Sequence, residues 1–239
     1  MFAEYINMSV GKKNICFAKQ NVDDSIGLLT TDFNNKSGKQ EYACNRKIKN
    51  IVAIGASAGG PKALQEIITT LPQDIPAAIM VVQHMPPVFT KSLAARLDNL
   101  SKVTVKEAED DDILKLGYVY IAPGDYHMTA VSKEEGCFMI KLDRQPQVEG
   151  HRPSANRMFE SFKELENVNI IAIILSGMGR DGTNGLKKLK ESKGVYVIAQ
   201  NENSSVVYGM PKSAVDSGIV DVSLPIEDIS SEIIKNVGV

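Results

Sequence analysis

The stretch that decides the fold is "IVAIGASAGGPKAL", residues 51–64. Four apolar residues lead through Gly55 and Ala56 to a serine, and a proline then precedes a helical pattern. A continuous apolar run is typical of a strand that is buried on both faces of a parallel sheet, and Pro61 suits the first turn of a helix. The stretch therefore predicts a strand, a tight turn that exposes Ser57, and a helix.

The rest of the chain repeats this alternation of apolar runs and segments with apolar residues at helical spacing. Residues 117–142 differ, because strand patterns follow one another there with only turn sequences between them. Alternating strands and helices imply βαβ units. We therefore predict an α/β fold with a doubly wound, mainly parallel sheet, helices on both faces and a β-hairpin insertion. After the hairpin, helices are expected at residues 153–165, 183–193, 206–218 and 226–237.

The first 46 residues do not follow this pattern. Residues 33–50 are mostly polar and have no clear period, and the pieces "NICFA" (14–18) and "SIGLL" (25–29) are short. Such composition is typical of a segment that is ordered only in part. We predict an N-terminal arm or linker over residues 1–46 and one globular domain over residues 47–239.

Composition excludes several classes of function. The formal net charge of -2 and the pI of about 6.0 give no nucleic-acid footprint, and no apolar run approaches the roughly 18 residues of a membrane helix. Three widely spaced cysteines fit neither a disulfide framework nor a zinc site, which indicates the reducing cytoplasm. The acidic run at 107–112 lacks further ligands at metal spacing. We expect no nucleic acid, no membrane insertion and no metal.

Two functions compete for the turn at residues 55–60. A dinucleotide fingerprint needs a glycine where this chain has Ser57, and an acidic residue after the second strand, where this chain has His84. The Walker sequence Gly-Lys-Ser/Thr is absent as well. The pentapeptide "GASAG" instead matches G-x-S-x-G, a strand-to-helix turn that exposes a nucleophilic serine. The sequence therefore favours a nucleophile over a phosphate cradle.

A nucleophilic serine needs a base, and the base needs an acid to orient it. His84 and Asp181 each follow an apolar strand, as Ser57 does, and the carboxyl ends of parallel strands meet at one edge of the sheet. These three residues are our candidate triad, although Asp181 could instead cap the next helix. His127 and His151 could lie at the rim of the site. The order Ser–His–Asp is not that of the α/β-hydrolases.

Between about residues 50 and 237 the chain resembles the catalytic domain of the CheB-type chemotaxis protein-glutamate methylesterases. The resemblance rests on six motifs that occur in order: "IGASAGGP", "QHMP", "YIAPGDYH", "HRPSANRMFES", "LSGMGRDG" and "SSVVYGMPKSA". It implies that Ser57 is the nucleophile, His84 the general base and Asp181 the acid.

The resemblance also implies the function. The family hydrolyses methyl esters of glutamate side chains on the cytoplasmic helices of methylated chemoreceptors, releases methanol, and can deamidate receptor glutamines, without metal or cofactor. The family usually carries a receiver domain ahead of the esterase. The 46 residues that precede it here lack the acidic pair, the central aspartate and the lysine of a receiver, so a stand-alone esterase domain is expected.

Four further residues are candidates for binding the substrate. Oxyanion donors are expected from the turn after Ser57, where Ala58 stands in place of the threonine of many relatives, and from the "GMG" loop with Met178. Arg152 and Arg180 are expected to contact acidic neighbours of the ester on a receptor helix. The alternatives are a non-catalytic receptor-binding module and a general small-ester hydrolase of the same fold.

Overall fold

The computed structural model describes residues 8–9, 14–15 and 46–238. The chain divides into two compact units, residues 1–41 and 42–239. In the first unit, β1 (Met8–Ser9) pairs with β2 (Asn14–Ile15) in antiparallel fashion. The remainder of "NICFA", all of "SIGLL" and most of the predicted arm lie outside the described residues, so the arm stays a prediction.

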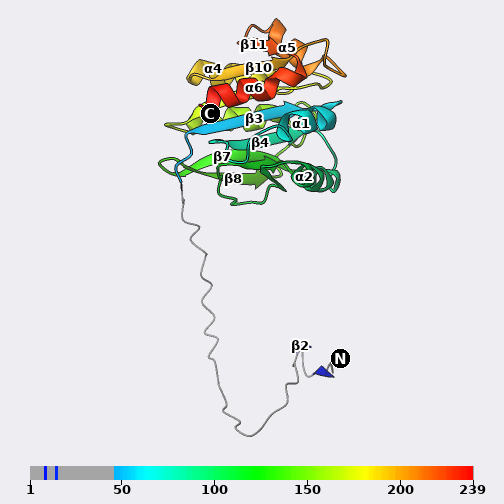
Figure 1. Cartoon of the computed structure of the whole chain (residues 1–239), viewed down its shortest axis with the longest axis vertical. Helices are drawn as coiled ribbons and strands as arrows, with labels where there is room; N and C mark the ends of the chain where they lie inside the picture. Colours follow the sequence, from blue (N-terminus) through cyan, green and yellow to red (C-terminus); the bar gives the residue numbers. More distant parts are fainter. Residues whose placement is uncertain (1–7, 10–13, 16–45, 239) are drawn as a thin grey trace. The chain divides into compact units, whose positions relative to one another are not determined.

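A seven-stranded sheet with the order β11-β10-β9-β3-β4-β6-β5 organises the second unit (Figure 1). Every pair of neighbouring strands is parallel, and β3 (Asn50–Ala56) lies at the centre. The other strands of this sheet are β4 (Ala78–Gln83), β5 (Thr104–Glu107), β6 (Tyr118–Ile121), β9 (Asn169–Ile174), β10 (Tyr196–Gln200) and β11 (Val222–Leu224).

The central strands are apolar throughout because each of their faces meets a core. Side chains of a strand alternate between the two faces of a sheet, so Ile51 and Ala53 of β3 enter one core and Val52 and Ile54 enter the other. All of them are fully buried. The continuous apolar run at the start of residues 51–64 is thus explained by burial on both sides.

Three helices cover each face of the sheet. One face carries α1 (Gly60–Ile68), α2 (Phe89–Leu100) and α6 (Ile226–Val237), and α1 and α6 lie side by side (Figure 1). The opposite face carries α3 (Ala155–Ser161), α4 (Thr183–Ser192), α5 (Met210–Asp216) and an antiparallel hairpin of β7 (His127–Glu134) and β8 (Cys137–Asp143). The predicted fold class is confirmed, hairpin insertion included.

Two of the expected helices differ in extent. The helix expected over 153–165 is α3 followed by the short 3₁₀ helix η1 (Phe162–Glu164). The helix expected over 206–218 begins only at Met210, so the prediction is wrong at its start. Val207 accepts a backbone hydrogen bond from Gly177 at 3.0 Å, and Gly177 in turn accepts one from Met210 at 2.8 Å. Residues 206–209 are therefore tied to the loop after β9 instead of forming a helical turn.

The order of the strands places a topological switch point at β3, where a doubly wound sheet has its crevice. The chain passes from β3 to β4 on one side, whereas β9 flanks β3 on the other. The helices that follow β3 and β9, α1 and α4, lie on opposite faces. A doubly wound sheet binds ligands at such a switch point, outside the carboxyl ends of its strands. Within the described ranges, none of the helices is both long and apolar enough to cross a bilayer.

Candidate active site

Ser57 stands directly after β3, at the carboxyl edge of the sheet. Its N–H donates to the carbonyl of Ser176 at 3.0 Å, and its carbonyl accepts from the N–H of Gly60 at 2.9 Å and from Nε2 of the buried Gln83 at 2.9 Å. Gly59 has a φ of 82°, a conformation that glycine adopts without steric cost. The backbone of the turn is thereby fixed while the serine side chain is left half-buried.

The loop after β9 approaches Ser57 closely because it has a glycine at the contact. A Cβ atom on Gly177 would lie 2.8 Å from Cβ of Ser57 and 2.3 Å from Sδ of Met210, distances that no larger residue could accommodate without movement. The buried Ser176 hydroxyl donates to the carbonyl of Ala58 at 2.7 Å. The turns after β3 and β9 are therefore joined into one rigid wall of the crevice.

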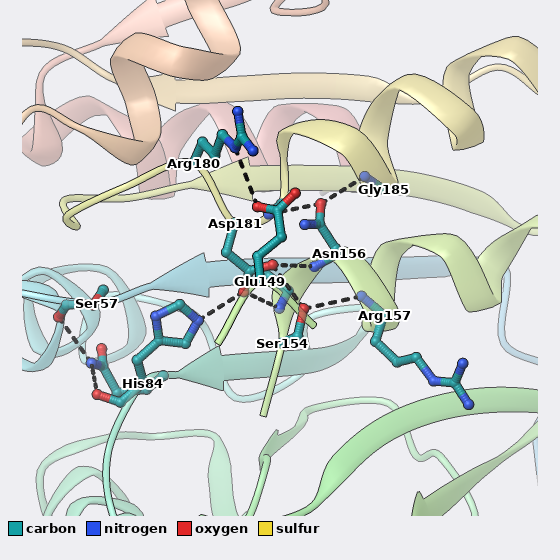
Figure 2. Close-up of polar contacts among 12 residues, drawn as sticks. Ser57, His84, Glu149, Ser154, Asn156, Arg157, Arg180, Asp181 and Gly185 are labelled. Atoms are coloured by element: carbon teal, nitrogen blue, oxygen red, sulfur yellow. Dashed lines mark hydrogen bonds and ion pairs between the residues drawn. The ribbon is translucent and has the colours of Figure 1, made fainter. Parts of the chain in front are cut away.

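His84 follows β4 and points across the crevice to Asp181, which follows β9. Its backbone N–H donates to the carbonyl of Ala56 at 3.0 Å, and its ring atom Nε2 lies 2.8 Å from Oδ2 of Asp181 (Figure 2). The His84 side chain is 10% exposed and that of Asp181 is fully buried. The structure thus brings together the two residues that the sequence places at separate strand ends.

Asp181 accepts four hydrogen bonds, three of which come from the start of α3. Oδ1 accepts from the Ser154 hydroxyl at 2.7 Å and from the N–H of Asn156 at 3.0 Å, and Oδ2 accepts from the N–H of Ala155 at 2.6 Å as well as from His84. The carboxylate caps no residue of α4, whose preceding residue is Gly182. The interpretation of Asp181 as an N-cap of the following helix is therefore wrong.

The hydrogen bonds to Asp181 determine its charge. Burial on its own would raise the pKa of this carboxyl group, but the hydrogen bonds from His84, from the Asn156 backbone and from Ser154 outweigh burial, so its pKa lies below the usual range. A carboxylate can only accept, so Nε2 of His84 is the donor in this contact. In the neutral ring, the other nitrogen, Nδ1, is then the acceptor. Nδ1 is buried and has no hydrogen-bond partner among residues 46–238.

The free Nδ1 atom is on the edge of the ring that is turned away from Asp181 and toward Ser57 (Figure 2). An unprotonated imidazole nitrogen can accept a proton from a serine hydroxyl. In the described part of the chain the Ser57 hydroxyl has no hydrogen-bond partner, so no hydrogen bond joins it to Nδ1 of His84. Catalytic hydrogen bonds are often long in the absence of substrate, so the arrangement is competent for general-base activation of the serine.

Asn156 holds the loop that carries Asp181. Its Oδ1 atom accepts from the N–H of Gly182 at 3.0 Å and from the N–H of Gly185 at 2.7 Å. It therefore ties the first turn of α3 to the beginning of α4. Sequence reasoning missed this residue, although its motif "HRPSANRMFES" was noticed, because an asparagine in a helical pattern carries no signal of a distant backbone contact.

His151, which the sequence predicts only at the rim of the site, lies against the proposed base. Its ring stacks on the ring of His84, with centroids 3.9 Å apart and planes 11° apart. His127 lies elsewhere: it is buried in β7, and its Nε2 atom contacts the carbonyl of Pro146 at 3.1 Å. Of the three histidines, two therefore belong to the site.

The four residues expected to bind substrate fall into two groups. Ala58 and Met178 are exposed, and their backbone N–H groups form no hydrogen bond within residues 46–238. Arg180 is exposed and lies 3.5 Å from a carboxylate oxygen of Glu149. Arg152 differs, because its guanidinium contacts Asp125 through Nε at 3.0 Å and donates to two backbone carbonyls at 3.1 Å. The donors of Arg152 are thus used within the protein.

One protein family matches most of this chain. The family model described as CheB methylesterase matches residues 52–233. A protein-glutamate methylesterase/protein-glutamine glutaminase of Oceanobacillus iheyensis is 48% identical over 188 residues, 78% of this chain and 53% of the relative. One of Geobacillus kaustophilus, with the same name, is 47% identical over 196 residues, 82% of this chain and 56% of the relative. The chain spans about half the length of these curated relatives.

A solved structure matches a similar share of the chain. The crystal structure of the Thermotoga maritima CheB methylesterase catalytic domain has a TM-score of 0.75 and 46% sequence identity, and the match covers 79% of this chain and 98% of that one. Ser57, His84 and Asp181 all lie within the matched family region, as do the strands of the sheet apart from the first two residues of β3. The chain therefore belongs to the CheB methylesterase family.

Proposed function

We propose that this chain is a serine hydrolase that removes methyl esters from glutamate side chains of chemoreceptors. The observation that carries the proposal is the environment of the His84 ring. One ring nitrogen lies 2.8 Å from a buried carboxylate, and the other is buried, has no hydrogen-bond partner among residues 46–238, and is on the side of Ser57. This is the arrangement of a base that is oriented by an acid and ready to accept a proton. The names of the relatives supply the ester.

The reaction then proceeds in two halves. The Ser57 oxygen attacks the ester carbonyl carbon while its proton passes to Nδ1 of His84, and the carbonyl π electrons move to the oxygen. When the tetrahedral intermediate collapses, the C–O bond to the methoxy group breaks and His84 returns the proton, so methanol leaves. Water then attacks the acyl-enzyme by the same route and releases the glutamate carboxyl group and Ser57.

The negative oxygen of the intermediate needs hydrogen-bond donors at about 2.7–3.1 Å. We assign this role to the backbone N–H groups of Ala58 and Met178, because both are unpaired in the described chain and lie in the two turns that meet at Ser57. A receptor glutamine would pass through the same intermediate with ammonia as the leaving group. The glutaminase in the names of the relatives is consistent with that second reaction.

The surface around the crevice suits a helix of a protein substrate. Among residues 46–238, the large hydrophobic side chains that are more than half exposed are Val88, Phe89, Met178 and Val206. They follow β4, β9 and β10, so all four lie at the edge of the sheet that carries Ser57. Contiguous exposed apolar side chains mark binding surfaces. Val88 also has a φ of 75°, a strained conformation for a β-branched residue.

A basic hollow lies next to this apolar rim, between α4 and α5. It has a volume of about 470 Å³, and its cationic side chains are Arg180, Lys187 and Lys212, against the single acidic residue Asp216. Arg180 lies 3.5 Å from Glu149 and Lys212 lies 3.4 Å from Asp216, but both cations are mostly exposed, whereas the Arg152 side chain is 20% exposed. We infer that the three cations of the hollow, rather than Arg152, bind glutamate carboxylates that neighbour the scissile ester on a cytoplasmic receptor helix. Helical substrates are bound through anchors three or four residues apart, which an apolar rim beside a basic hollow can provide.

Methanol release from a methylated receptor fragment tests the proposal. We expect turnover of the ester on the helical fragment at a far higher kcat/KM than turnover of free glutamate γ-methyl ester, because remote contacts raise catalysis only on the substrate that makes them. Equal efficiency on both esters would indicate a general small-ester hydrolase. Receptor binding without methanol release, and without labelling of Ser57 by a fluorophosphonate, would indicate a non-catalytic binding module.

A further inference from the structure

The ring of His151 is placed against His84 by a short turn. Val148 and His151 exchange two backbone hydrogen bonds of 3.1 and 3.0 Å. Between them, Glu149 and Gly150 have φ values of 50° and 84°, as the two central residues of a type I′ turn do. Glu149 anchors the turn to α4, because its carboxylate accepts a hydrogen bond from the side chain of Asn184 at 2.8 Å. The position of the ring is therefore fixed by backbone geometry.

His151 contacts the candidate site through the flat face of its ring. Its side chain forms no hydrogen bond within residues 46–238. Its ring instead stacks on that of His84, with the centroids 3.9 Å apart and an angle of 11° between the two ring planes. The His84 ring has a single hydrogen bond, from Nε2 to Asp181, and Nδ1 has none in that part of the chain. One bond at Nε2 leaves the ring free to turn about that contact, and a stacked ring removes this freedom.

We propose that His151 is a positioning residue, whose ring holds the His84 imidazole in the plane that directs Nδ1 to Ser57. The inference rests on the proposed use of Ser57 as a nucleophile. Misplacement of a catalytic group by about 1 Å can cost roughly 100-fold in rate, so loss of the stack is expected to be visible in catalysis. A flat ring without nitrogen atoms should serve as well as histidine.

The charge of His151 matters for the same reason. His84 becomes a cation in the transition state, and the other charged groups that face His151 are Asp181, Glu149 and, paired with Glu149, Arg180. Burial first, and the neighbouring His84 second, lower the pKa of His151, against the raising effect of Asp181 and Glu149. His151 is therefore neutral at pH 7 and does not oppose the positive charge that develops on His84.

The test compares His151→Phe, which keeps a flat face, with His151→Leu, which fills similar space without one. Labelling of Ser57 by a fluorophosphonate measures the competence of the site without any receptor substrate, so it remains informative if the methyl ester proves to be the wrong substrate. At pH 8 we expect His151→Leu to react about 10- to 100-fold more slowly than the wild type, and His151→Phe to stay within about threefold. Gln147→Ala, on the same exposed segment, is the matched control and should not change the rate.

The pH profile supplies a readout that a purely structural role would not move. In the wild type, a second titratable ring, that of His151, stacks on the general base, so protonation of His151 should steepen the acid limb of the labelling rate beyond first order. In His151→Phe this second group is gone, and the limb should stay first order. Equal slowing in both variants, or wild-type rates in both, would overturn the proposal, as would an unchanged acid limb in a folded His151→Phe protein.

Discussion

The two ends of the candidate triad are built in opposite ways. At the acid end, the Asp181 carboxylate is buried and accepts hydrogen bonds from four donors. At the nucleophile end, the Ser57 hydroxyl has no hydrogen-bond partner in the described chain, Ala58 is exposed, and the nearby Met178 is 70% exposed. One end is saturated with contacts before any ligand arrives, and the other is left unsaturated.

This difference shows how a single site combines rigidity with access. A charged group that is fully bonded cannot reorient without losing several hydrogen bonds of roughly 1.5–3 kcal/mol each. Asp181 therefore gives His84 a fixed anchor at Nε2, while the stacked ring of His151 lies against the face of the imidazole. Donors that remain unpaired near Ser57 are instead available to a group that exists only during the reaction, which is the condition for stabilising a transition state.

The comparison predicts, first, that Ser57→Ala separates activity from stability. Methanol release should fall by roughly 1,000-fold or more, because the nucleophile is gone. The free energy of unfolding, measured with urea, should change by less than about 0.5 kcal/mol, because the half-buried hydroxyl has no hydrogen-bond partner to lose among residues 46–238. A variant that loses more than about 1 kcal/mol of stability would contradict the description of this end as unsaturated.

Asp181→Asn should damage both properties. An amide nitrogen would face a backbone N–H whichever way the side chain is turned, because Ala155 donates to one oxygen and Asn156 to the other. We expect a loss of about 2–3 kcal/mol in the free energy of unfolding and a fall in rate of roughly 100- to 10,000-fold from the disturbed His84 tautomer. Asp74→Asn, at an exposed position, is the control and should leave both values unchanged.

Acid unfolding should expose the contribution of Asp181 alone. Its pKa is lowered in the folded state, so between about pH 3.9 and the folded pKa the unfolded chain binds a proton that the folded chain does not. Stability from this group is complete above about pH 4 and is lost as the pH falls through the folded pKa. The wild type should thus lose stability more steeply below pH 4 than Asp181→Asn. Parallel curves for the two proteins would show that the hydrogen bonds do not favour the charged form.

The smallest effect is expected outside the triad, at the basic hollow. Replacing Lys187 and Lys212 by glutamate should lower kcat/KM for an acidic receptor fragment by about tenfold at low salt, and the loss should shrink as salt screens the charges. The rate on free glutamate γ-methyl ester should not change. The double variant Lys102→Glu/Lys235→Glu, at exposed positions away from the hollow, has the same charge change. An equal loss in that control would attribute the effect to net charge.

The sequence was sufficient to predict the fold and the shared location of three residues. Buried parallel strands carry an unmistakable signal, because both faces of β3 and β4 must be apolar. Residues that follow such strands are bound to meet at one edge. The shared edge of Ser57, His84 and Asp181 could therefore be foreseen without knowing the register of the sheet. Their proximity also depends on the strand order, in which β4 and β9 flank β3.

Contacts made by connecting segments could not be foreseen in this way. The stacking of His151 depends on where the turn at 148–151 crosses the crevice, and no periodicity determines that position. Arg152 was expected at the substrate because it is basic and near the site in sequence, yet its guanidinium contacts Asp125 and the carbonyls of Arg144 and Gln145. Whether a surface arginine is already paired is a property of tertiary structure.

The hydrogen bonds that Asn156 accepts from the N–H groups of Gly182 and Gly185 determine when the candidate site can form during synthesis of the chain. Ser57 and His84 are synthesised early, but β3 cannot acquire its neighbour β9, nor Asp181 its donors, until the chain has grown beyond residue 185. A nascent chain on the ribosome therefore carries Ser57 through the 128 residues of elongation from 57 to 185 without the means to use it as a nucleophile. Reactivity toward serine probes would appear late and abruptly, as a chemical mark of completed synthesis.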